Sequence, residues 1–237
     1  MWEFLDTGAS SAEENMRIDA DLLSQLGEQE RPVLRLYDWS GKSATFGLLT
    51  KPEQYLNLEK VVEQELDLAK RPTGGGIVFH IWDLAFSTLV PAKCSLFSEN
   101  TLSNYALIND CVLNVVGSFM GGAFEASITP EDASPLDGNC KRFCMAQPTK
   151  YDVVWNGCKI AGAAQRQTKR GFLHQGTISL REPDYPFLEK VLLPGSRVLD
   201  AMRIKTFALL GPSATDKDYQ EARTRLKQLL TSHFRNL

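Results

Sequence analysis

A run of glycines gives the first indication of chemistry in this sequence. Gly74, Gly75 and Gly76 follow soon after Arg71 and stand directly before an apolar run, residues 77–79. Because glycine has no side chain, a glycine loop that feeds a strand brings bare backbone N–H groups close to a ligand. Successive N–H donors suit an anion, such as a phosphate or the oxyanion of an activated acyl group. The glycines alone are also typical of a plain turn.

A lysine on an apolar strand gives the second indication. Lys159 comes just after Asn156-Gly157, the preferred turn of a two-residue β-hairpin, and just before the apolar run 160–163. The side chain must either reach solvent or meet an anion, because a buried ammonium without a partner is costly. The residues by themselves leave both readings open.

The cysteines indicate neither a disulfide framework nor a metal cluster. There are five, and their spacing is irregular. Cys144 lies in a long segment without periodicity, residues 127–148, and loops of that length inside a compact domain are often functional. A thiol near Lys159 is a candidate nucleophile, and a buried cysteine without chemistry is the alternative.

The composition limits the class of protein. The chain has 237 residues, of which 43% are hydrophobic and 23% charged, enough for a large core. The formal net charge of -3 provides no basic field, so we expect no nucleic-acid partner. No apolar run is long enough to span a membrane and the first residues are acidic, unlike a signal peptide, so we expect no membrane partner and a cytoplasmic location.

The apolar spacing predicts alternating strands and helices around these residues. Residues 77–79 and 85–90 are expected to form a hairpin across residues 80–83. Helices are predicted from the serine pair at 10–11 to about residue 26, over 58–69, from about 101 to 119, and over 218–234. Further strands are predicted at 2–6, 33–37, 153–155, 158–163 and 173–180, and another is predicted to begin at residue 45.

Three motifs together resemble the lipoate-protein ligase A and octanoyltransferase family. They are the loop 71–76, the run Lys159-Ile160-Ala161-Gly162-Ala163-Ala164-Gln165, and the strand around Gly176-Thr177. Residues 2–6, 15–16 and 19 also resemble the opening of the family, and the matching order makes chance improbable. The resemblance implies an α/β (α+β) fold of the biotinyl/lipoyl-ligase type, with a larger mixed sheet, a smaller sheet and flanking helices. It implies one catalytic domain over 1–237, without a separate C-terminal accessory domain.

The resemblance also implies roles for residues. Lys159 matches the lysine that contacts the acyl carbonyl and phosphate, where it would stabilise the transition-state oxyanion. Asp152 is a candidate ligand of Mg²⁺ or of a ribose, and the alternative is that it only begins a strand. Two positions depart from the family pattern. Ile81 stands where the family often has aspartate, and Gln175 stands where the family usually has histidine. His174 is one residue earlier, and because adjacent strand residues face opposite ways it cannot take over that role. The residues expected to bind the acyl group or its adenylate are Arg71, Thr73, Gly74, Gly75, Gly76, His80, Asp152, Gly162, Ala163, Gln165, His174, Gly176 and Thr177.

Three functions follow from the resemblance. The first is a lipoate-protein ligase, which uses ATP and Mg²⁺ to make an adenylate of lipoate or octanoate. It then acylates a lysine of a lipoyl-domain protein, either an E2 subunit of a 2-oxoacid dehydrogenase or the glycine-cleavage H protein. The second is an octanoyltransferase that takes octanoyl from an acyl carrier protein through a thioester on Cys144. The third is an inactive relative that only binds lipoyl domains.

Some sequence details favour the octanoyltransferase and others favour the ligase. Cys144 stands seven residues before Tyr151, the spacing of the transferase cysteine from the aromatic residue that opens the lysine hairpin. Gly76 is intact as in ligases, whereas transferases often lose this glycine, and Met145 replaces the aromatic residue that usually follows the cysteine. Both functions depend on Lys159.

Overall fold

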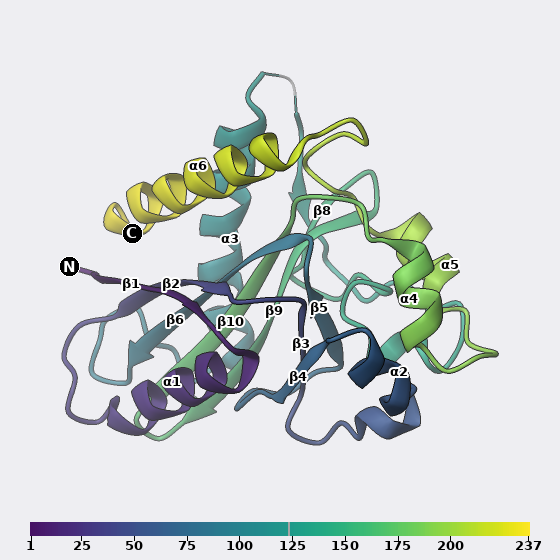
Figure 1. The fold of residues 1–237 in the computed structure, drawn as a ribbon. Coiled ribbons are helices and arrows are strands. Elements are labelled where there is room, and N and C mark those ends of the chain that lie inside the picture. The colour runs from purple at the N-terminus through teal and green to yellow at the C-terminus, as the bar shows by residue number, and fades with distance from the viewer. Residues whose placement is uncertain (123) are drawn as a thin grey trace.

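Two sheets form the frame of the molecule. The computed structural model describes residues 1–122 and 124–237, and its larger sheet has the strand order β1-β2-β6-β10-β9-β8-β7 (Figure 1). The β1 and β2 strands are parallel and the other neighbours are antiparallel, so the sheet is mixed as expected. The strands are β1 Glu3–Ser10, β2 Val33–Trp39, β6 Asp83–Pro91, β7 Ser127–Ile128, β8 Val153–Trp155, β9 Cys158–Thr168 and β10 Gly171–Ser179.

The smaller sheet has three strands in the order β4-β3-β5. They are β3 Ser43–Phe46, β4 Asp67–Lys70 and β5 Ile77–His80. The helices are α1 Ala12–Gln25, α2 Leu58–Glu63, α3 Thr101–Met120, α4 Tyr185–Val191, α5 Val198–Lys205 and α6 Asp216–Arg235, with 3-10 turns η1 Pro52–Gln54 and η2 Cys140–Arg142. Figure 1 shows α2, α4 and α5 gathered beside the small sheet, and α6 crossing near α3.

Helices cover both faces of the large sheet. Leu89 and Leu173 belong to a cluster with Leu23 of α1, while their neighbours Val90 and Phe172 belong to the main core with residues of α3 and α6. Successive strand residues point to opposite faces, so the central strands are buried on both sides. Every residue of β6 and of β10 is therefore buried, the polar residues included.

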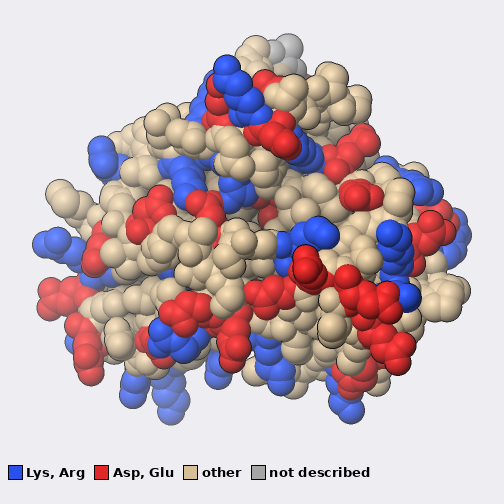
Figure 2. Space-filling model, in the orientation of Figure 1, with Lys and Arg blue, Asp and Glu red and all other residues tan. Residues whose placement is uncertain are grey.

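The surface carries charges of both signs. Figure 2 shows lysine and arginine side chains interspersed with aspartate and glutamate over the visible face. This mixture agrees with the small formal net charge of -3. In the described part of the chain, no helix combines the length and the apolar character that crossing a membrane requires.

Two predictions of local structure were wrong. The helix expected over 58–69 ends at Glu63, and Glu65 takes a positive φ of 54°, after which the chain enters β4. Of the apolar residues that appeared to continue the helical stripe, Leu66 therefore lies just before β4 and Ala69 lies on it. The hairpin expected from 77–79 and 85–90 does not form either, because β5 pairs with β3 and β6 pairs with β2 and β10. The connection 80–83 instead passes from the small sheet to the large one.

Candidate active site

A cavity lies between the two sheets. It encloses about 400 Å³ of space, part of it open to solvent, and residues of α1, β2, β3, β5, β9 and β10 line it together with Arg71 after β4 and one residue of the 140–146 segment. The sequence-predicted residues that line it are Arg71, His80, Cys144, Lys159, Gly162, Ala163, Gly176 and Thr177. The structure thus brings together residues that are far apart in the sequence.

Lys159 is buried and paired. Its Nζ lies 2.6 Å from Oδ2 of Asp152, and each side chain is only 3% exposed, so it is not a surface lysine. Gly162 provides the space, since a Cβ at that position would lie 2.2 Å from Cε of Lys159 and 2.6 Å from Oδ1 of Asp152. The pairing of β8 with β9 is irregular here, with a register shift between Val153 and Val154. The ammonium is therefore held in place on the cavity wall.

Asp152 is held by Lys159 and Thr149. Its Oδ2 also accepts hydrogen bonds from N and Oγ1 of Thr149, at 2.6 and 2.9 Å. Burial raises the pKa of the Asp152 carboxyl, against the opposing effects of Lys159 and Thr149. Among residues 1–122 and 124–237 there is no cluster of three His, Cys, Asp or Glu side chains suited to a metal. The Mg²⁺ role expected for Asp152 stays a prediction, because one carboxylate beside substrate phosphates is enough to bind this ion.

Arg71 organises the glycine loop from within. Its guanidinium donates to the carbonyl oxygens of Gly74 and Gly76, both at 2.8 Å, and to O of Thr45 at 3.2 Å. Gly75 has a φ of 85°, and a Cβ on Gly76 would lie 2.1 Å from the carbonyl oxygen of residue 142. The hydrogen bonds of the loop glycines in the described chain use their carbonyl oxygens. Gly74 and Gly75 are exposed whereas Gly76 is buried, so the N–H groups of Gly74 and Gly75 are the ones accessible to a ligand.

Cys144 reaches the cavity because its segment pairs with β5. The Cys144 amide donates to O of Ile77 at 3.1 Å, and Phe143 forms a β-bridge with the same residue. The thiol is half-buried, and its Sγ lies 3.9 Å from Nη2 of Arg71. A sulfur atom and the ammonium of Lys159 therefore line one cavity beside the glycine loop.

Gln175 joins the loop to a buried polar network. Oγ1 of Thr73 donates to Oε1 of Gln175 at 2.6 Å, and Nε2 of Gln175 donates to Oδ2 of Asp19 at 2.6 Å. Asp19 also pairs with Arg35 at 2.8 Å, and both of these side chains are fully buried. The departure from the family pattern at Gln175 thus has a defined structural role. Sequence reasoning missed Arg35, although an arginine flanked by leucines on a predicted strand is a signal for a buried partner.

His80 is fixed on three sides. Its Nδ1 lies 2.7 Å from Oδ2 of Asp83, its Nε2 lies 2.9 Å from Oγ1 of Thr45, and its ring stacks on Trp39 with 4.4 Å between ring centroids. Oγ1 of Thr177 donates to the same oxygen of Asp83. Asp83 and Thr45 were not predicted as site residues, because their contacts with His80 become visible only when the two sheets are placed together.

Two predicted residues face away from the cavity. His174 is fully buried on the other face of β10, where its ring meets Tyr105 of α3 at 5.5 Å and Nδ1 lies 3.3 Å from Oε1 of Gln165. Burial lowers the pKa of His174 to about 3. Gln165 also contacts O of Thr101 on that face, at 3.4 Å. Strand alternation accounts for both placements.

Comparison with known proteins decides the family. The model of the lipoyl protein ligase A/B catalytic domain matches residues 11–207. The chain belongs to this family. Its membership places it among enzymes of lipoyl and octanoyl transfer. The match includes the glycine loop, Cys144 and Lys159, and it ends before α6 begins at Asp216.

Relatives within the family carry a transferase name. The octanoyltransferase LipM of Lysinibacillus sphaericus is 30% identical over 206 residues, which cover 86% of this chain and 75% of that protein. The octanoyltransferase LipM of Bacillus subtilis is 28% identical over 204 residues, which cover 85% of this chain and 73% of that protein. This chain is therefore similar to octanoyltransferases over most of its length.

Solved structures confirm the expected fold. Protein Ta0514, a lipoate protein ligase from T. acidophilum with bound lipoic acid, superposes with a TM-score of 0.69 at 20% identity, covering 98% of this chain and 86% of that one. A lipoate-protein ligase A bound with ATP superposes with a TM-score of 0.70 at 20% identity, covering 99% of this chain and 85% of that one. The shared architecture is the two-sheet α/β fold of the lipoate ligases.

Proposed function

We propose that this chain transfers an octanoyl group to a lysine of a lipoyl-domain protein through a thioester on Cys144. One observation carries the proposal: the Cys144 sulfur lines the same cavity as the Lys159 ammonium and lies 3.9 Å from Nη2 of Arg71. A nucleophile beside fixed positive charge and bare amides is the arrangement that acyl transfer through a thioester requires. The similarity to octanoyltransferases supports the same choice.

The first half of the reaction loads the cysteine. The thiolate of Cys144 attacks the carbonyl carbon of an octanoyl thioester, the bond from that carbon to the donor sulfur breaks, and the donor thiol leaves with the proton that Cys144 gave up. The acyl chain lies in the cavity, where the small residues 162–164 leave room beside Val78. The Lys159 ammonium and the loop amides stabilise the oxyanion of the tetrahedral intermediate.

The second half transfers the acyl group. The amine of the acceptor lysine attacks the thioester carbon, an amide forms, and the Cys144 sulfur leaves and regains a proton from the amine. No electron is gained or lost overall. The proposed acceptors are the lipoyl domains of E2 subunits and the glycine-cleavage H protein, with an acyl carrier protein as donor. We take 1–237 as a single catalytic unit that works in the cytoplasm.

The ATP-dependent ligase is the second candidate. It is favoured by the glycine loop, because Gly76 packs too closely against residue 142 for a side chain and the N–H groups of the loop remain available to a phosphate. In that reaction ATP would activate the carboxylate of lipoate or octanoate as an adenylate. Any Mg²⁺ would have to arrive with the phosphates, since Asp152 is held by Lys159 and Thr149.

One experiment separates these functions. The protein is incubated with octanoyl-carrier, or with octanoate, ATP and Mg²⁺, and then with a lipoyl domain, and both proteins are weighed by mass spectrometry. The transferase predicts a hydroxylamine-labile octanoyl adduct on Cys144 from the carrier alone, lost in Cys144→Ala and kept in Cys158→Ala. Full ATP-dependent transfer by Cys144→Ala would overturn the thioester route, and no transfer with either donor would favour the inactive lipoyl-domain-binding relative.

A further inference from the structure

A groove lined by three cations runs from the glycine loop to the turn between β9 and β10. Its lining includes Ala20 and Ser24 of α1, Pro72 of the loop, and Arg166, Lys169 and Arg170. Nη1 of Arg166 donates to O of Pro72 at 3.2 Å, which ties the groove to the loop. No aspartate or glutamate of the described chain lines it, and none forms an ion pair with the three cations. The groove is therefore an exposed strip of uncompensated positive charge.

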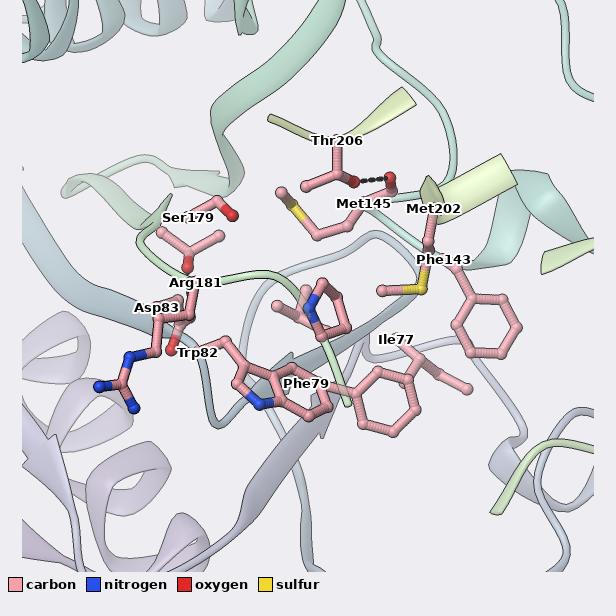
Figure 3. A pocket seen from close by; sticks show the side chains of 13 residues that line it. Ile77, Phe79, Trp82, Asp83, Phe143, Met145, Ser179, Arg181, Met202 and Thr206 are labelled. Carbon is pink, nitrogen blue, oxygen red and sulfur yellow. Dashed lines mark hydrogen bonds between the residues drawn. The ribbon is translucent and has the colours of Figure 1, made fainter. Parts of the chain in front are cut away.

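Two other depressions beside the active site have a different charge. The one drawn in Figure 3 contains Asp83, and its arginine, Arg181, lies at the edge and pairs with Asp216 at 2.8 Å. The depression between α1 and β4 carries Glu13 and Asp67 in addition to its cations. An anionic partner that approaches the active site is therefore attracted most strongly by the groove along β9.

The groove continues the face of β9 that carries the active site. Ala164 lines the active-site cavity, and Arg166 and Thr168 line the groove, so the three alternate residues share one face of the strand. Ala164 lies beside Cys144, since the Cβ position of Gly75 is 3.7 Å from Cβ of Ala164 and 3.8 Å from Sγ of Cys144. Four residues of strand place Thr168 about 13 Å from Ala164. The cations at the turn are thus a little more than one such length from the sulfur.

We infer that this groove docks the acidic carrier protein that delivers the octanoyl group. The inference rests on the proposed function, in which the donor holds octanoyl as a thioester on a phosphopantetheine arm. That arm is roughly 16 Å long from sulfur to phosphorus when extended, and it ends in a phosphodiester at the surface of the carrier. With the thioester at Cys144, the phosphodiester and the acidic surface around it reach Lys169 and Arg170. Fixed opposite charge at that distance steers the carrier and sets its orientation.

The first test compares donors that keep the acyl chain. Octanoyl-carrier is compared with the octanoyl thioesters of pantetheine and of ethanethiol, which lack both the phosphate and the protein. The rate of Cys144 acylation is measured by mass spectrometry at several donor concentrations, in roughly 0.05 M and 0.5 M salt. The KM for octanoyl-carrier is expected to rise at least threefold at the higher salt, whereas the two small donors change by less than about twofold. An equal response of all three donors would overturn the inference.

Variants assign the effect to the groove. Lys169 is exposed, and Lys169→Glu is expected to raise the KM for octanoyl-carrier by about three- to tenfold, with Lys169→Arg close to the wild type. Lys190→Glu is the matched control, because it makes the same change of net charge at an exposed position of α4, beside the small sheet. Equal effects of the two reversals would show that only the total charge matters and would contradict the assignment. A raised KM for the lipoyl domain in place of the carrier would assign the groove to the acceptor and overturn the inference.

Direct binding separates this inference from the proposed function. If no thioester forms on Cys144 with any donor, the proposed function fails, and octanoyl-carrier is then titrated into the protein in a calorimeter. Binding that Lys169→Glu weakens at least threefold, but Lys190→Glu leaves unchanged, would support the docking groove even then. No binding of octanoyl-carrier to the wild type, or equal binding by the wild type and Lys169→Glu, would overturn it.

Discussion

The ammonium of Lys159 and the carboxylate of Asp152 form an ion pair of 2.6 Å in which each side chain is 3% exposed. Neither charge has another ionic partner in the described chain. Removing one partner from such a pair leaves an uncompensated buried charge, whereas the intact pair holds the ammonium at a fixed place on the cavity wall. The pair is thus a structural element, and under the proposed function it also positions the catalytic ammonium.

The substitution Lys159→Met tests the role of the ammonium. The loss of one preorganised oxyanion-stabilising group is expected to lower the rate of octanoyl transfer by about 10²- to 10³-fold. The rate is measured with octanoyl-carrier and a lipoyl domain, and the fold is checked by thermal unfolding. Activity within about twofold of the wild-type rate would mean that Lys159 has no part in the chemistry.

The substitution Asp152→Ala tests the structural side of the pair. Leaving the Lys159 ammonium buried and unpaired is expected to lower the free energy of unfolding by roughly 3 kcal/mol or more. Urea unfolding of the variant and the wild type gives the difference. The double variant Asp152→Ala with Lys159→Met should recover part of the loss, and a double variant less stable than either single one would contradict this account.

Gly162 has no space for a side chain. A Cβ there would overlap Cε of Lys159 at 2.2 Å, so Gly162→Ala is expected to displace the ammonium and lower the transfer rate by about 10²-fold or more. Gly117→Ala is the matched control, because nothing lies within 4 Å of its Cβ position in α3 and alanine favours a helix by about 0.5–1 kcal/mol. Equal activity of the two variants would show that Lys159 needs no exact position.

His174 makes the protein sensitive to acid. Burial lowers the pKa of His174 from 6.5 to about 3. Between these pH values the unfolded chain binds a proton that the folded chain does not. The free energy of unfolding therefore falls as the pH falls, by about 1.4 kcal/mol per pH unit for this one group. Urea unfolding of the wild type and of His174→Phe between pH 6.5 and 4 measures the slope, and an unchanged slope in the variant would refute the prediction.

The C-terminal helix holds the connection that carries His80 and Asp83. The hydroxyl of Tyr219 donates to the carbonyl oxygens of Ile81 and Asp83 at 3.1 and 3.0 Å, and Arg223 donates to the same Asp83 oxygen. This helix lies outside the residues that the family model matches.

Tyr219→Phe is therefore expected to reduce the transfer rate by about two- to tenfold, which corresponds to a hydrogen bond worth about 0.5–1.5 kcal/mol. Lys217→Ala, two residues away and 83% exposed at its side chain, is the control. Steady-state kinetics with pantetheine and ethyl thioesters separates this positioning effect from a general loss of stability. A fall in the melting temperature without any kinetic change would show that Tyr219 acts on stability alone.

Local patterns predicted much of the framework. The hairpin turn is confirmed, since Asn156 and Gly157 have positive φ values of 50° and 76°. The helix expected from about 101 to 119 spans Thr101–Met120, and the closing helix expected over 218–234 spans Asp216–Arg235. These segments were predictable because long apolar stripes and special turn residues depend on near neighbours in the chain.

What could not be predicted depends on contacts between distant segments. An apolar stripe fits both a helix and a helix followed by a strand, so only the positive φ of Glu65 and pairing with β3 show that β4 begins at Asp67. His80 has two partners from different sheets, Asp83 from the large sheet and Thr45 from the small one. The sequence motifs indicated which residues meet, whereas the hydrogen bonds that orient them needed the structure.

The connection from His80 to Asp83 joins β5 of the small sheet to β6 of the large one, and the His80–Asp83 hydrogen bond bridges the same gap, whereas the His80–Thr45 contact lies within the small sheet. At this edge only two residues, Ile81 and Trp82, connect the two walls of the cavity. Under the proposed function, trimming a wall residue such as Val78 is expected to admit a longer fatty chain. The chain-length preference of the proposed reaction would then follow side-chain volume, open to change one methyl group at a time.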